Sequence, residues 1–130
     1  MPIVTQDERP PGPGRFPLTE KRMLLDEGTT SSPVSMGELV LHPGAYVPPH
    51  RHDVEEAFYV VAGHPTCMTG DEVCRAAPGD AVLAPAGALH SLRNETAEDV
   101  KLVYFYPVAA KAQDLGISAD YPESTADVDS

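Results

Sequence analysis

Four side chains that can bind a metal ion lie in two short segments near the middle of this chain. His50 and His52 are two residues apart, and Glu56 follows after four more. Residues i and i+2 of a β-strand point to the same face, so an unbroken strand would place these three side chains together. His90 lies in a second segment and would have to come from a neighbouring strand. The pattern therefore favours a β-structure in which two strands meet around one set of ligands.

This donor set predicts the class of metal. Three imidazoles and one carboxylate suit divalent Fe, Mn, Ni, Cu or Zn, whereas Ca²⁺ and Mg²⁺ prefer shells of oxygen. Four protein ligands leave one or two positions open on a five- or six-coordinate ion, and a catalytic metal needs an open position. A His-x-His pair alone is common and indicates little. The prediction depends on its combination with Glu56 and His90.

The spacing of both segments resembles the two sequence motifs of the cupin family. The first motif, Gly-x5-His-x-His-x3-Glu-x6-Gly, matches at Gly44, His50, His52, Glu56 and Gly63. The second, Gly-x5-Pro-x-Gly-x2-His-x3-Asn, matches at Gly79, Pro85, Gly87, His90 and Asn94. The resemblance covers residues 44–94. It implies a double-stranded β-helix or jelly-roll barrel, and it implies that His50, His52, Glu56 and His90 hold a divalent transition metal.

The other motif positions have structural interpretations. Gly44 and Gly63 are expected in turns where a Cβ would be in the way. The run Pro85-Ala86-Gly87 reads as a turn before His90. Asn94 is expected to bond to backbone rather than to metal.

The rest of the chain predicts an all-β domain with irregular ends. Short strands divided by Gly and Pro turns are typical of a sandwich or barrel, and they are expected at 21–26, 34–42, in two segments within 48–63, and at 65–69, 72–76, 80–84, 89–94 and 100–106. The expected units are an extended Pro-rich arm without regular structure (1–17), a barrel (18–115) with one or two helical turns after 108, and a flexible acidic tail (116–130).

Charge narrows the choice of partners. The chain has 9 Lys and Arg against 20 Asp and Glu, a formal charge of −11, which argues against nucleic acid and anionic membranes. The first residues lack the apolar core of a signal peptide and no stretch has transmembrane length, so a cytoplasmic location is expected. The resemblance implies a homodimer, with the arm able to pack across a partner subunit.

Cys67 and Cys74 flank a predicted two-residue hairpin turn, which would place them directly opposite each other. A cross-strand disulfide is one interpretation. Two reduced, apolar side chains are the other, and a reducing cytoplasm favours it.

Strand parity suggests which side chains surround the metal. Phe58, Val60 and Ala62 share parity with Glu56, and Leu92 shares parity with His90. Of these, Phe58, Val60 and Leu92 are the candidate substrate contacts; an ordinary apolar core is the alternative. Tyr104 is the candidate catalytic residue, as a hydrogen-bond donor or base, although packing alone would also explain it. His42 and His64, outside the motifs, are expected to be surface or turn residues.

Three functions fit this site. The first is a metal-dependent oxygenase or dioxygenase acting on a small organic, aromatic or diketone-like substrate. The second is a redox-neutral lyase, isomerase or cyclase in which the metal polarises a carbonyl. The third is a cupin that binds a small ligand without chemistry. In the small cupin dimethylsulfoniopropionate lyases a tyrosine follows the ligand Glu by two residues; Phe58 stands there, which argues against that activity.

Overall fold

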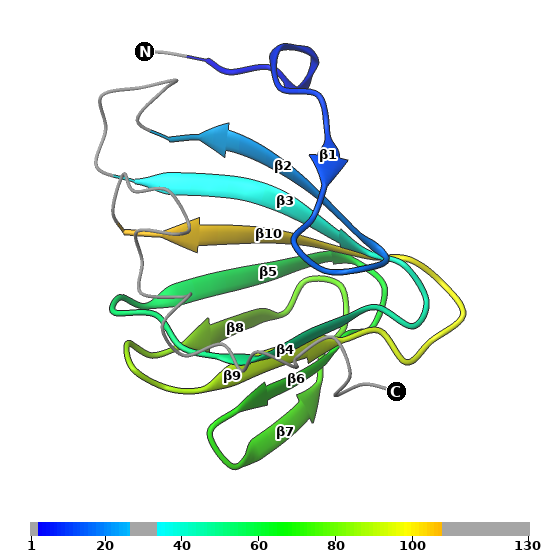
Figure 1. Cartoon of the computed structure of the whole chain (residues 1–130), viewed down its shortest axis with the longest axis vertical. Helices are drawn as coiled ribbons and strands as arrows, with labels where there is room; N and C mark the ends of the chain where they lie inside the picture. The colour runs from blue at the N-terminus through cyan, green and yellow to red at the C-terminus, as the bar shows by residue number, and fades with distance from the viewer. Residues whose placement is uncertain (1–2, 27–33, 108–130) are drawn as a thin grey trace.

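The computed structural model describes residues 3–26 and 34–107 and shows a protein built from β-strands (Figure 1). In chain order the elements are a single-turn 3-10 helix η1 (Gln6–Glu8) and the strands β1 (Gly12–Pro13), β2 (Thr19–Leu25), β3 (Ser35–Leu41), β4 (Tyr46–His50), β5 (Glu56–Ala62), β6 (Thr66–Thr69), β7 (Glu72–Arg75), β8 (Ala81–Ala84), β9 (His90–Arg93) and β10 (Val100–Tyr106). They form a six-stranded sheet, β1-β2-β3-β10-β5-β8, and a four-stranded sheet, β4-β9-β6-β7. Every pairing is antiparallel, and the described residues contain no α-helix, which confirms the all-β prediction.

The core lies between the two sheets. In the large sheet, Val60 pairs with Leu102 and Phe58 with Tyr104, so these four side chains share one face. Val60 and Leu102 are fully buried, and burying side chains of this size contributes about 1.5–3 kcal/mol each. From the small sheet and its approach, the same core receives Ala45, Val47, Cys67 and Leu92.

The segment before β2 differs from the prediction of an arm without regular structure. It contains η1 and β1, and Gly12 of β1 pairs with Lys21 of β2. Arg22 holds the segment in place, because its Nη1 donates to the carbonyl oxygens of Gln6 (2.6 Å) and Arg9 (2.8 Å). These contacts attach Gln6, Arg9 and Gly12 to β2 of the same chain. The expected helical turns after 108 and the acidic tail lie outside the described residues.

Two motif glycines take the left-handed conformation that favours glycine. Gly44 has φ +88° with space around it, so its requirement is conformational. Gly63 has φ +82°, and a Cβ there would also lie 2.5 Å from the carbonyl oxygen of Asp99. Gly63 therefore lets the end of β5 pass close to the start of β10.

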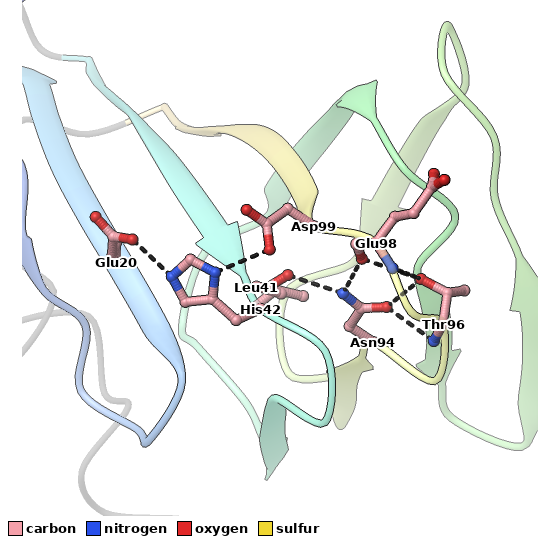
Figure 2. Close-up of polar contacts among 7 residues, drawn as sticks. All are labelled: Glu20, Leu41, His42, Asn94, Thr96, Glu98 and Asp99. Atoms are coloured by element: carbon pink, nitrogen blue, oxygen red, sulfur yellow. Dashed lines mark hydrogen bonds and ion pairs between the residues drawn. The ribbon is translucent and has the colours of Figure 1, made fainter.

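Asn94, the last residue of the second motif, fastens the loop between β9 and β10 to β3 (Figure 2). Its Nδ2 donates to the carbonyl oxygens of Leu41 (2.8 Å) and Glu98 (2.7 Å). Its Oδ1 accepts from the backbone N–H (3.0 Å) and the hydroxyl (2.7 Å) of Thr96. The side chain is 1% exposed, so the expectation that Asn94 bonds to backbone is confirmed.

The two cysteines are neighbours on the β6–β7 hairpin. Cys67 pairs directly with Cys74, as the turn residues predict. Both are free thiols, which agrees with the interpretation as reduced side chains. Burial raises the pKa of the Cys67 thiol to about 12, so this thiol is a poor source of thiolate.

Candidate metal centre

The four predicted ligands come together from both sheets. His50 ends β4 and pairs with His90 at the start of β9, in the small sheet. Glu56 begins β5 in the large sheet, and His52 lies in the connection between β4 and β5. One donor atom from each side chain can be chosen so that all four lie within 4.8 Å of one another. All four are buried, between 2% and 5% exposed.

The ligands do not lie on one unbroken strand, which strand parity alone would assume. The strand ends at His50, residues 51–55 are irregular, and β5 starts at Glu56. The chain thus crosses from the small sheet at His50 to the large sheet at Glu56, and His52 lies within the crossing. Glu56 faces the histidines because the two sheets face each other across the core.

Hydrogen bonds orient two of the histidines. His50 Nδ1 lies 2.8 Å from the carbonyl oxygen of Pro48, and His90 Nδ1 lies 3.2 Å from that of Ala88. A carbonyl accepts only, so each Nδ1 carries the proton and donates it. Burial, with the nearby His90, lowers the pKa of His50 to about 3, so His50 is neutral. Its Nε2 therefore presents a lone pair to the cluster, as a metal ligand must.

Glu56 stands at the centre of the cluster. Its Oε1 lies 3.0 Å from His52 Nε2 and 3.2 Å from His90 Nε2. Burial alone would raise the pKa of this carboxyl, but the hydrogen bonds with His52 and His90 outweigh it and lower the pKa to about 2. The carboxylate is therefore charged. A neutral His90 whose Nδ1 donates to Ala88 has no proton on Nε2 to give to Glu56, and a cation between them would satisfy both groups.

A divalent metal fits that requirement. Neighbouring ligands held about 2.1 Å from one ion at right angles lie about 3 Å apart, close to the separations around Glu56 Oε1. His52 Nδ1 is buried without a hydrogen-bond partner in the described part of the chain, so this nitrogen is available to a metal. The residues present thus match the predicted donor set of three imidazoles and one carboxylate. The identity of the metal does not follow from them.

Three of the four apolar side chains that strand parity places near the metal ligands point inward in the structure. The Phe58 ring packs against His90, with ring centroids 6.2 Å apart, and Val60 and Leu92 are buried in the core. Ala62 is an exception: it is exposed rather than inward, because a register shift between Lys101 and Leu102 changes its face. Contact of Phe58, Val60 and Leu92 with a substrate stays a prediction.

Of the two inward tyrosines of β10, Tyr106 rather than Tyr104 reaches the ligands. The Tyr106 hydroxyl lies 3.4 Å from His52 Nε2, and the two rings meet edge to face at 5.3 Å. The Tyr104 hydroxyl instead donates to the sulfur of Met23 at 3.7 Å. Burial, with the negative charge of Glu56, raises the pKa of Tyr104, so it is not suited to act as a base.

Sequence reasoning missed Tyr106 and Lys21. Tyr106 shares the parity of Tyr104, so the pattern pointed to both residues equally. Lys21 lies on β2, and its Nζ stands 5.1 Å from the centre of the Tyr104 ring. The sequence pattern that could have identified Lys21 is the alternation Thr19, Lys21, Met23 along β2. These three residues point to the same, inward face of the strand, where a lysine is unusual.

The histidines outside the motifs are not part of the cluster. His64 is exposed, as predicted. His42 is 34% exposed, and its Nε2 and Nδ1 pair with Glu20 (2.6 Å) and Asp99 (2.9 Å), as Figure 2 shows. His42 therefore ties β2, the end of β3 and the approach to β10 together.

Known proteins resemble the chain in sequence motif and in fold. A family model described as "Cupin domain" matches residues 37–106. Polyketide cyclase RemF from Streptomyces resistomycificus is 22% identical, with a TM-score of 0.73 over 82% of this chain and 78% of that one. KdgF from Halomonas sp. is 21% identical (TM-score 0.70, 88% and 99% covered), and a predicted oxalate decarboxylase from Thermotoga maritima is 22% identical (TM-score 0.68, 83% and 99%).

At these identities the structural likeness shows the fold alone. No curated protein matches the chain. In the part of the chain that the structure describes, no helix is both long and apolar enough to cross a membrane.

Proposed function

Because this chain belongs to the cupin family, we propose that it is a metal-dependent enzyme, and in the first place an oxygenase or dioxygenase acting on a small organic substrate. The carrying observation is the set of four buried donors from His50, His52, Glu56 and His90, which converge from two sheets. Such a set would hold divalent Fe, Mn, Ni, Cu or Zn and leave coordination positions for substrate.

When bound, the metal would supply Lewis acidity and, if it is redox-active, a path for electrons from substrate to O2. The protein's own residues prepare the site for this. Phe58 and the buried side chains behind it keep water from the ligands, which suits a carbon-rich, aromatic or diketone-like substrate. Tyr106 can hold a proton beside His52 and donate it to a substrate oxygen.

A redox-neutral metal-dependent cyclase, lyase or isomerase is the second candidate. The observation that favours it is the presence of two proton-bearing groups inside the barrel, the Tyr106 hydroxyl and the Lys21 ammonium. Proton transfer is the task that such a reaction adds to carbonyl polarisation. The likeness to a protein named as a polyketide cyclase agrees with this class, on the level of fold.

The first experiment is metal content after purification without O2 or added metal. Wild-type protein should carry about one ion per chain, and His52→Ala should lose most of it with its circular dichroism unchanged. His42→Ala is the matched control, because His42 lies outside the cluster. Equal metal content in wild type and His52→Ala would refute the ligand assignment.

O2 uptake then separates the reaction classes. Uptake with aromatic or diketone substrates by wild type, absent in His52→Ala, would support the oxygenase. Turnover that continues without O2 would support the redox-neutral class. A wild-type protein that takes up no metal would overturn both and leave a cupin that binds its ligand without chemistry.

We also propose that the protein is a homodimer in the cytoplasm. The outer face of the large sheet carries exposed apolar side chains on adjacent strands: Tyr59 and Val61 on β5, Leu83 on β8 and Phe105 on β10. A second copy would cover this row, since contiguous apolar surface favours association. Sedimentation at micromolar concentration tests it: Phe105→Asp should shift the protein to a monomer, and an unchanged dimer would place the interface elsewhere.

A further inference from the structure

Lys21 projects into the interior that holds the metal ligands. On β2 it pairs with Leu39 of β3, which pairs with the fully buried Leu102 of β10. Opposite residues on neighbouring strands share a face, so Lys21 belongs to the inward series. Its Nζ lies 5.1 Å from the centre of the buried Tyr104 ring, a cation–π contact made inside the barrel.

Lys21 lies within electrostatic reach of a metal ligand, Glu56. Burial lowers the pKa of its ammonium group, the carboxylate of Glu56 raises it, and the guanidinium of Arg15 lowers it. Glu56 also raises the pKa of Tyr104, the residue under the ammonium group. Lys21, Tyr104 and Glu56 therefore share one electrostatic environment, and Arg15 adds a second positive charge to it.

Within the described ranges, Lys21 differs from the basic residues next to it because no acidic side chain forms an ion pair with it. On the outer face of the same sheet, Arg22 and Lys101 both pair with Glu38, at 3.1 Å each. Among the described residues, Lys21 Nζ makes no hydrogen bond or ion pair. Burial outweighs the attraction of Glu56, so the pKa of the Lys21 ammonium group is lowered and its charge is only partly compensated in the interior.

A bound metal would increase the need for an anion. A divalent ion against the single carboxylate of Glu56 leaves one net positive charge, and the Lys21 ammonium adds another. A negatively charged ligand that reaches both would balance the interior. The catalytic metal and the lysine would then hold two different parts of one small molecule.

We propose that Lys21 is a substrate-binding residue that receives an anionic oxygen group, a carboxylate or a phosphate, on a substrate whose other end lies at the metal. This inference rests on the proposed function, because it takes the four-ligand cluster as the metal site. It narrows the substrate class to anionic small molecules. It does not depend on whether the reaction uses O2.

Calorimetric titration of zinc-loaded protein with malonate, and separately with inorganic phosphate, tests the proposal without turnover. Lys21→Met keeps the length and apolar stem and removes the charge. It should lower the affinity for the preferred anion at least about tenfold, while Zn²⁺ affinity stays as in wild type and the melting temperature does not fall. Lys21→Arg should retain most anion binding, and Lys101→Met, which removes a lysine from the outer face, should bind anions as wild type does.

Each outcome decides something. Tighter malonate binding assigns a carboxylate to the substrate, and tighter phosphate binding assigns a phosphate ester. Wild-type affinity in Lys21→Met, or no anion binding by zinc-loaded wild type, would overturn the role of Lys21 and leave the metal site standing. Failure of wild type to bind Zn²⁺ at all would overturn the proposed function itself, and this inference with it.

Discussion

Replacing Asn94 by alanine should lower the free energy of unfolding and leave the metal content unchanged. The change removes the two hydrogen bonds that Nδ2 donates and the two that Oδ1 accepts. Four bonds at about 0.5–1.5 kcal/mol each set an upper range of about 2–6 kcal/mol. After the substitution, the polar groups of Thr96 and Glu98 can form hydrogen bonds with water instead. The carbonyl oxygen of Leu41 cannot, because Leu41 is fully buried. We therefore expect a loss of about 2–4 kcal/mol, a large part of the 5–15 kcal/mol typical of a domain.

Urea denaturation followed by circular dichroism measures this loss. With a slope of about 2 kcal/mol per molar urea, the midpoint should fall by about 1–2 M. Metal content, measured on the same preparation, should stay within about twofold of wild type, since a buried side chain bonded to backbone makes no contact with the ligand cluster.

Asn94→Asp is the control that tests the direction of the bonds. One carboxylate oxygen of the aspartate still accepts hydrogen bonds from Thr96. The other replaces the donor Nδ2 and faces the carbonyl oxygens of Leu41 and Glu98, which cannot donate to it. At neutral pH it should destabilise the protein at least as much as alanine does, because an unmatched buried charge costs more than a missing group. A loss below about 1 kcal/mol in Asn94→Ala would show that these hydrogen bonds do not stabilise the fold, and a collapse of metal content with stability unchanged would show that Asn94 acts on the metal site instead.

Two further substitutions test the turn after β5 and the surface ion pairs. Gly63→Ala should destabilise by about 2–4 kcal/mol in urea, from about 1–2 kcal/mol of left-handed strain and a clash with the carbonyl oxygen of Asp99; a change under about 0.5 kcal/mol would show that the chain moves aside freely. The hydrogen bonds with Asp99 and Glu20 raise the pKa of His42. A group whose pKa is raised by folding stabilises the folded state most when protonated, below its unfolded pKa of about 6.5. Wild type should therefore melt above His42→Gln at about pH 5.5, and the gap should shrink as the pH rises through the raised pKa; a gap that widens with pH would contradict the ion pairs.

The metal ligands could be predicted because their identity lies in local spacing. His50, His52, Glu56 and His90 are separated by intervals that match a known pair of motifs, and the structure brings all four together. Parity also placed Tyr59 and Val61 outside and Val60 inside, as found. Parity failed at Ala62, because Lys101 pairs with Ala62 while Leu102 pairs with Val60, so that β5 has one extra residue, Val61, at this point.

The long-range neighbours of the site could not be predicted in the same way. Tyr104 and Tyr106 have identical parity, and their different roles depend on where β10 lies relative to His52. Lys21 is 35 residues before Glu56 in the chain, and its effect on the site depends on β2, β3, β10 and β5 pairing in that order. Short-range patterns carry no information about such an order.

Strands β2 to β10, the turn glycines and the four donors could be read from the amino-acid sequence, because alternation, φ preference and ligand chemistry are local properties of a chain. The tertiary structure alone decided which proton-bearing and charged groups stand beside those donors. Glu56 meets the histidines because the chain crosses between sheets at residues 51–55, and Lys21 and Tyr106 reach the same interior from strands at the two ends of the described chain. Distance in space is set by the pairing order of the strands and by the packing of one sheet on the other, and these follow from the burial of the whole core rather than from any one segment.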